Sequence, residues 1–161
     1  MNTNHQYIYG QCNAPVASLC YGKAKKPVAE VGCGAVALYN AMTAKGIPVE
    51  FENLLREMEA LKMPWLFGVF GTKPLSLRRF LRKNNIPFKN YISLQRFKHQ
   101  LTDNHVGIVC AWNPRFYGIH FYCVLPQDGQ LYSLNYISSN QKQPFDDNIL
   151  SVTRFIIGYI L

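Results

Sequence analysis

The most informative stretch of this 161-residue chain is residues 30–46, which read Glu-Val-Gly-Cys-Gly-Ala-Val-Ala-Leu-Tyr-Asn-Ala-Met-Thr-Ala-Lys-Gly. From Cys33 onward the stretch is almost uniformly apolar, which predicts a helix that is buried on nearly every side. Gly46 is typical of the residue that follows a helix C-terminus. We therefore expect this segment to be the central helix around which the other elements pack.

Three further helices are expected before the last third of the chain. Apolar residues at helical spacing predict one over residues 50–63, which Pro64 ends. A third helix is expected to start near Thr72, with Pro74 in its first turn. Ser93 is expected to be the N-cap of a fourth.

The last third of the chain changes to a β pattern. Residues 105–112 and 120–125 predict two strands, and residues 130–136 predict a third. The second and third are joined through Asp128-Gly129, a strong hairpin signal between two apolar runs. Residues 152–161 predict a final strand. Helices followed by an antiparallel sheet indicate the α+β class.

Length and composition fit a single domain over residues 1–161, in which residues 1–30 form an irregular N-terminal segment. Apolar residues make up 48% of the chain and charged residues only 16%, which excludes an intrinsically disordered protein. No run of about 18 apolar residues is present, so we expect no insertion into a membrane. The N-terminus also lacks the pattern of a signal peptide.

The five cysteines are an odd number with no C-x-x-C spacing, which argues against a complete disulfide framework. Cys12, Cys20 and His5 fit no common zinc spacing, so no metal and no cofactor are expected. Without an export signal, the simplest expectation is a reduced, cytoplasmic protein.

The net charge of +8 is unevenly distributed, because no acidic residue occurs between Glu59 and Asp103. That stretch holds nine of the seventeen cations: Lys62, Lys73, Arg78, Arg79, Arg82, Lys83, Lys89, Arg96 and Lys98. Such a block is either a solvated helical face or a surface for an acidic partner. No phosphate-loop, RRM or helix-turn-helix signature accompanies it, so nucleic acid is the less favoured partner. The oligomeric state stays open.

Cys33 is the residue best placed to carry chemistry. The positive end of a helix stabilises a thiolate, and its unpaired N–H groups can hold an oxyanion. The flanking Gly32 and Gly34 are expected to let a substrate backbone approach closely. The alternative is that Cys33 is a small apolar core residue, as buried cysteines often are.

A nucleophilic cysteine needs a base, and His120 is the best candidate of the four histidines. It opens an apolar strand directly after a glycine-containing loop, at the expected rim of a cleft. Asn135 lies across the hairpin, so its side-chain carbonyl is expected to accept the imidazole N–H and fix the tautomer. A satisfied strand-end histidine and a turn asparagine are the simpler alternatives.

The order of these residues resembles the papain-like cysteine peptidase fold, most closely the C39-type bacteriocin-processing peptidases and their C39-like bacterial relatives. The matching pieces are residues 32–34 with the helix that follows, residues 71–77, and residues 120–124 followed by Asn135. The similarity covers roughly residues 28–161. Its signal is the order and spacing of these motifs.

This resemblance implies a thiol hydrolase acting on a peptide or protein. Cys33 would be the nucleophile, His120 the base and general acid, and Asn135 the orienting residue. Processing peptidases of the family cut after small residues such as a double glycine. Two alternatives stay open: a cysteine-dependent acyltransferase, and an inactive papain-like module that binds an acidic partner through Arg78, Arg79, Arg82 and Lys83.

The sequence departs from the family pattern at the expected oxyanion hole. The family usually carries a glutamine six residues before the nucleophile, and that position is Pro27 here. Gln11 and Asn13 are the candidates to replace it. The nearer Glu30 is unsuitable, because an ionised carboxylate opposes an oxyanion. The third residue is also usually Asp in the bacteriocin-processing family, where this chain has Asn135.

Overall fold

A computed structural model describes residues 6–13, 15–114, 118–136, 141–146 and 153–161. The helices are α1 (Val28–Val31), α2 (Cys33–Ala44), α3 (Phe51–Ala60), α4 (Leu77–Lys83) and α5 (Leu94–Gln100), with one 3-10 turn, η1 (Trp65–Gly68). The main strands are β3 (Lys89–Tyr91), β4 (Gly107–Asn113), β5 (Gly118–Gln127), β6 (Gln130–Leu134), β7 (Gln143–Pro144) and β8 (Arg154–Ile160). Two short strands, β1 (Cys20–Tyr21) and β2 (Lys26–Pro27), pair with each other.

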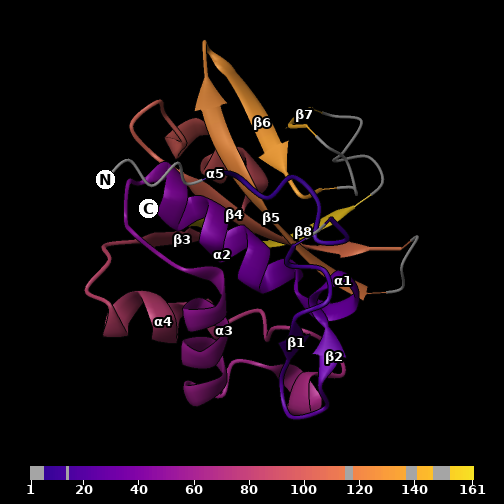
Figure 1. The fold of residues 1–161 in the computed structure, drawn as a ribbon. Helices are drawn as coiled ribbons and strands as arrows, with labels where there is room; N and C mark the ends of the chain where they lie inside the picture. Colours follow the sequence, from indigo (N-terminus) through magenta and orange to yellow (C-terminus); the bar gives the residue numbers. More distant parts are fainter. Residues whose placement is uncertain (1–5, 14, 115–117, 137–140, 147–152) are drawn as a thin grey trace.

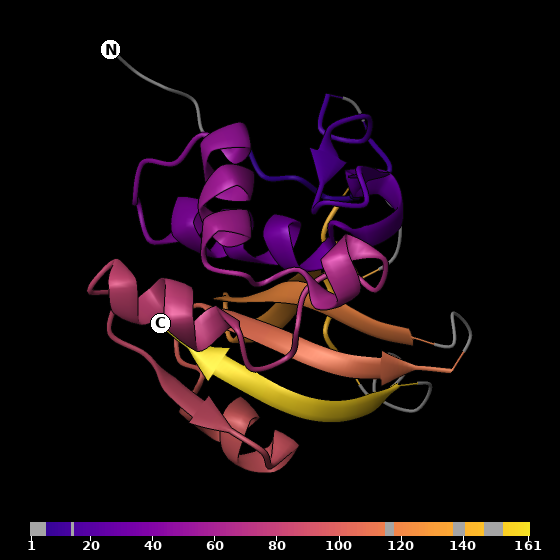
Figure 2. The same cartoon turned by 90° about the horizontal axis from the view of Figure 1, so that it is seen from below.

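The six main strands form one antiparallel sheet in the order β3-β8-β4-β5-β6-β7 (Figure 1). Helices α2 and α3 lie on one face of this sheet, and α5 lies on the other (Figure 2). The alternation along β5 produces these two layers, because Phe121 and Cys123 pack toward α2 while Tyr122 and Val124 pack toward α5. The predicted α+β class is confirmed.

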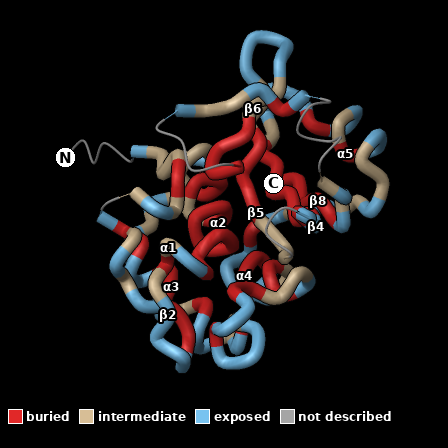
Figure 3. Tube along the Cα trace, turned by 90° about the vertical axis from the view of Figure 1, so that its right-hand side faces the viewer, coloured by how far each residue is buried: buried red, intermediate tan, exposed pale blue. Residues whose placement is uncertain are grey.

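Helix α2 is the buried central helix that its sequence predicts, since nine of its twelve residues are buried (Figure 3). Its C-terminus is closed as expected by Gly46, whose φ is +67°. The N–H of Gly46 donates to Thr43 and that of Ile47 donates to Met42, at 3.0 and 2.9 Å. These two bonds satisfy carbonyls that the helix end leaves unpaired.

Helix α3 is shorter than predicted, because it ends at Ala60 instead of reaching Met63. Lys62 takes a left-handed φ of +55°, and the N–H of Met63 donates to the carbonyl of Met58 at 3.0 Å. The backbone therefore leaves the helix before Pro64 can end it, in the geometry that a glycine usually supplies.

Helix α4 starts later than predicted, at Leu77 instead of near Thr72. Thr72 forms an isolated antiparallel bridge with Pro64, and its buried hydroxyl lies 3.1 Å from the Tyr21 hydroxyl. These contacts hold residue 72 in an extended segment. Helix α5 begins as predicted, with the Ser93 hydroxyl accepting the N–H of Arg96.

The predicted β5–β6 hairpin is present. Asp128 and Gly129 have φ values of +53° and +74°, and Gln127 pairs with Gln130 on either side of them. Two consecutive left-handed residues match the twist of the flanking strands. Strand β3 was not predicted, because its three residues carry no apolar alternation; it is held by pairing with β8.

Three of the four basic residues of α4 contact groups of the protein. Lys83 forms a 3.0 Å ion pair with Glu57, and a guanidinium nitrogen of Arg79 donates to the carbonyl of Leu61 at 3.5 Å. Arg78 hydrogen-bonds the hydroxyl of Tyr159. These contacts favour the interpretation of α4 as a structural, partly solvated face. Among the residues described, no helix combines the length and apolar character needed to cross a membrane.

Candidate functional site

One cleft of about 740 Å³ brings together the three residues that the sequence singles out. Cys33 lies at the start of α2, His120 lies near the start of β5, and Asn135 follows the end of β6. Helix α2 packs across β5, and Cys33 at its N-terminus lines the same cleft as His120 of β5. Segments far apart in the sequence therefore meet in one cavity.

Cys33 is the first residue of α2 and is buried. Burial raises the pKa of its thiol above the usual 9.0, because the thiolate loses its hydration. Hydrogen bonding from the backbone N–H groups of Phe121, Gly34 and Cys33 itself acts in the opposite direction. The thiol is consequently protonated at neutral pH and needs a base to become a nucleophile.

The glycines beside Cys33 serve packing rather than substrate access, which corrects the expectation from the sequence. A Cβ on Gly34 would lie 2.4 Å from the Thr72 hydroxyl oxygen, and one on Gly32 would lie 2.4 Å from a methyl group of Val28. Neighbouring residues already fill the space that each absent side chain leaves. These glycines let α2 start tightly against α1 and against residue 72.

His120 is held by the backbone of the segment that follows β6. Its Nε2 lies 2.5 Å from the carbonyl oxygen of Asn135. A carbonyl can only accept, so Nε2 carries the proton, and Nδ1 of the neutral ring is left as the basic nitrogen. The ring also stacks on Tyr122, with centroids 6.0 Å apart and planes inclined by 29°.

Burial lowers the pKa of His120 below its usual 6.5, because the imidazolium is costly to desolvate. Hydrogen bonding to the backbone of Asn135 and Tyr136 acts in the opposite direction. A neutral imidazole and a protonated thiol are therefore the forms that share the cleft at neutral pH.

Asn135 contacts His120 through its main chain, whereas the sequence predicts a contact through the side-chain carbonyl. Its Oδ1 instead accepts the backbone N–H of Gln11 at 2.8 Å, and its Nδ2 lies 3.3 Å from Gln11 Oε1. The residue has a left-handed φ of +66°, which asparagine tolerates better than most residues. The side-chain amide is engaged by the N-terminal segment and orients the imidazole only indirectly.

Gln11, one of the two candidates for the oxyanion hole, lines the cleft. Its Nε2 donates to the carbonyl of Ala29 at 2.9 Å, so the side chain ties Asn135 to the segment that leads into α2. Asn13 does not line the cleft; its N–H donates to Gly10 at 3.0 Å. The backbone N–H groups of the first turn of α2 have no acceptor within the helix, so they are candidate donors for an oxyanion.

The N-terminal segment is also held at Ile8 by the side chain of Asn40, a contact that was not predicted from the sequence. The Asn40 side chain accepts the N–H of Ile8 and donates to its carbonyl, both at 2.8 Å. An amide in the middle of an apolar helix was the available signal, because such a group must find partners when it is buried.

An apolar wall of the cleft was missed as well. Its members are aromatic or aliphatic side chains from four segments of the chain: Trp65, Val69, Phe70, Trp112, Ile119 and Tyr136. Residues 65–70 were expected only as a connection between helices. A run of large apolar residues in a connection between helices was the signal that could have identified them.

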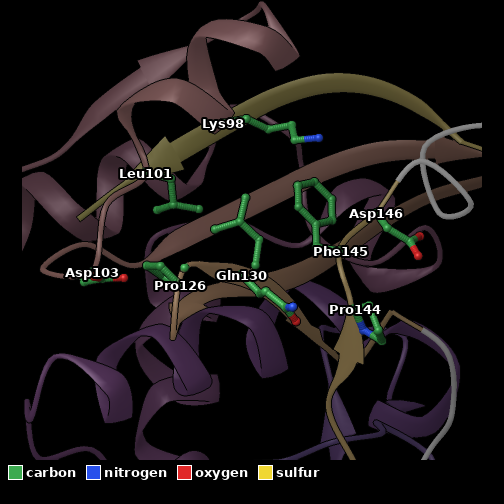
Figure 4. A pocket seen from close by; sticks show the side chains of 10 residues that line it. Lys98, Leu101, Asp103, Pro126, Gln130, Pro144, Phe145 and Asp146 are labelled. Atoms are coloured by element: carbon green, nitrogen blue, oxygen red, sulfur yellow. The ribbon is translucent and has the colours of Figure 1, made fainter.

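A second pocket of about 670 Å³ lies beside the β5–β6 hairpin (Figure 4). Its charged lining residues are Lys98, Asp103 and Asp146. Among the described residues that line it there is no cysteine or histidine. It therefore offers neither a cysteine nucleophile nor an imidazole base, whereas the cleft at Cys33 and His120 offers both.

The five cysteines are unpaired, as their odd number suggested. Cys110 and Cys123 are buried in strands, whereas Cys12 and Cys20 are exposed. The described residues contain no group of three or more His, Cys, Asp or Glu side chains that could hold a metal ion. His5, considered with Cys12 and Cys20 in the sequence analysis, lies outside the described residues.

Comparisons of the chain with protein-family models, with curated proteins and with solved structures find no match.

Proposed function

We propose that this protein is a papain-like thiol hydrolase that cleaves a peptide or related amide bond. The observation that carries the proposal is one cleft holding a helix-N-terminal thiol, Cys33, and a histidine, His120, whose Nε2 is fixed by a backbone carbonyl. In that arrangement Nε2 carries the proton of the neutral ring, which leaves Nδ1 unprotonated and able to act as the base. The arrangement supplies the nucleophile and the base that amide cleavage through a thioester needs.

In the acylation step, Sγ of Cys33 attacks the substrate carbonyl carbon while Nδ1 of His120 takes the thiol proton. The carbonyl oxygen becomes an oxyanion, which backbone N–H groups of the first turn of α2 stabilise. The C–N bond then breaks, and the imidazolium gives its proton to the leaving amine. A thioester between the acyl group and Cys33 remains.

In the deacylation step, the same imidazole takes a proton from water as the water oxygen attacks the thioester carbon. The C–S bond breaks, the acid leaves, and the proton returns to the Cys33 sulfur. Asn135 and Gln11 keep the imidazole in the required tautomer throughout, because the carbonyl of Asn135 holds the Nε2 proton and Gln11 holds Asn135.

Alkylation with iodoacetamide, mapped by mass spectrometry, tests the nucleophile. Cys110 and Cys123 are matched controls, because they are also buried. A C12S/C20S background removes the two exposed thiols from the measurement. We expect Cys33 to react faster than both controls, and His120→Ala to abolish the difference. Equal rates at Cys33, Cys110 and Cys123 would show that Cys33 is an inert core residue.

A further inference from the structure

We propose that Trp65, Val69 and Phe70, in the loop of residues 65–70, form with Trp112 a subsite that selects a bulky apolar residue of the substrate. This inference rests on the proposed hydrolase function and narrows it. It also departs from the small residues that the C39-type resemblance implies. Trp65, Val69, Phe70 and Trp112 line the same cleft as Cys33, so a substrate bound at the thiol passes along them.

The backbone of this loop has a conformation that its residue types disfavour. Leu66 and Phe67 have φ values of +44° and +62°, where large side chains crowd the backbone. Strain of this kind persists only where surrounding structure imposes it, and it concentrates at functional sites. The left-handed φ values of Leu66 and Phe67 therefore indicate that neighbouring segments impose the conformation of this loop.

Backbone hydrogen bonds fix this loop, one to the segment around residue 24 and one between its own two ends. The N–H of Ala24 donates to the carbonyl of Phe67 at 2.8 Å, and the N–H of Trp65 donates to the carbonyl of Gly71 at 2.7 Å. A Cβ added to Gly22 would lie only 2.6 Å from the Phe67 carbonyl oxygen, so the two backbones are in close contact. The apolar side chains are thus presented by a fixed support.

The four residues line the cleft, and each leaves a large part of its surface exposed to solvent. Trp65 is 40% exposed, Val69 47%, Phe70 63% and Trp112 38%. The rings of Trp65 and Phe70 lie beside each other, with centroids 6.2 Å apart. A ligand side chain that covers this surface gains the free energy of apolar burial, which a glycine residue cannot supply.

The charges of the cleft favour an uncharged ligand residue. Within the part of the chain that the structure describes, no lysine or arginine lines the cleft, so an acidic side chain would find no ion-pair partner there. The carboxylate of Glu30, which lines the cleft, already forms an ion pair with Lys26 at 3.2 Å. Bulk and apolar character are the properties that this wall can select.

A set of internally quenched peptides tests the subsite. The peptides share one scaffold and place Phe, Leu, Gly-Gly or Asp in turn at each position around the scissile bond. At one position we expect Phe and Leu to exceed Gly-Gly in kcat/KM by roughly tenfold to a hundredfold, and Asp to be the poorest. Phe70→Ala should remove most of that preference. Leu66→Ala is the matched control, because Leu66 is exposed on the same loop but does not line the cleft.

Binding can be measured separately from cleavage, because both tryptophans of the chain line this cleft. In Cys33→Ala protein, titration with the unlabelled Phe peptide should change the tryptophan fluorescence, and the Gly-Gly peptide should bind at least tenfold more weakly. Apolar-selective binding without any cleavage by the intact protein would support the subsite and overturn the hydrolase function. Cleavage with no apolar preference, or equal effects of Phe70→Ala and Leu66→Ala, would overturn the subsite alone. Absence of both binding and cleavage would overturn both.

Discussion

The two walls of the Cys33 cleft are built in opposite ways. On the polar wall, Gln11, His120 and Asn135 are joined by hydrogen bonds, and each has a partner that restricts its position. On the apolar wall, Trp65 and Phe70 stand on a strained but anchored loop and leave apolar surface exposed. The polar wall is suited to position reacting groups, and the apolar wall to contact a ligand. Changes to the first should act on kcat, and changes to the second on substrate preference.

The largest effect is expected at the reacting groups beside the polar wall. Cys33→Ala removes the nucleophile and His120→Ala removes the base, so each should lower kcat by at least about 10³-fold. The double variant should be little worse than either single variant, because the two residues act as a unit. Peptide cleavage under saturating substrate measures this. Near-normal turnover by His120→Ala would remove histidine from the mechanism.

The pH dependence should be the next largest effect. Burial lowers the pKa of His120 and raises that of Cys33, so the neutral imidazole and the neutral thiol coexist near pH 7. The rate kcat/KM should rise with pH as the imidazole loses its proton, with a midpoint below the usual His value of about 6.5. Alkylation of Cys33 needs the thiolate, so it should keep rising through pH 9, by about tenfold per unit. A plateau of alkylation beginning near pH 5 would instead indicate a thiolate–imidazolium pair.

Asn135→Gly should have a moderate effect, because glycine keeps both the carbonyl that His120 contacts and the left-handed φ. The variant loses the Asn135 side-chain amide that pairs with Gln11. This loss should lower kcat by about tenfold, the equivalent of roughly 1.4 kcal/mol. Gln11→Ala should have a similar effect, and the double variant should be non-additive because the two side chains pair. A loss as large as that of His120→Ala would mean that the Asn135 side chain orients the base directly.

Gly22→Ala tests the support of the apolar wall without touching the polar wall. The added Cβ would meet the Phe67 carbonyl at 2.6 Å, and φ at Gly22 is +76°. We expect the free energy of unfolding to fall by about 2–3 kcal/mol and the apolar substrate preference to weaken. The reactivity of Cys33 toward iodoacetamide should be retained. Denaturant unfolding and the alkylation rate measure the two quantities.

Gly129→Ala is the matched control and the smallest expected effect. Gly129 has nearly the same φ, +74°, but an added Cβ would have nothing within 4 Å. Only the backbone cost of a left-handed alanine applies, about 1–2 kcal/mol, with no change in substrate preference. If Gly22→Ala and Gly129→Ala lower the free energy of unfolding equally, the contact between Gly22 and Phe67 does not stabilise the loop.

The features that depend on local chemistry could be predicted from the order of residues alone. The apolar run after Cys33 required a buried helix, and Gly46 ended it where a left-handed residue was needed. Asp128 and Gly129 defined the β5–β6 hairpin for the same reason. The candidate nucleophile and base were also identifiable, since a thiol at a helix start and a histidine at a strand start are visible in the order of residues.

The way in which these groups are held depends on contacts between segments that are far apart in the chain. The pairing of Gln11 with Asn135 joins residues that no local pattern relates, and it replaced the side-chain contact to His120 that the sequence predicts. The left-handed Leu66 and Phe67 contradict their local preferences, because contacts with residues 22 and 24 impose that geometry. Residue order restricts each segment's own conformation. Contacts between distant segments are settled only when the whole chain packs, and the candidate active site is assembled from such contacts.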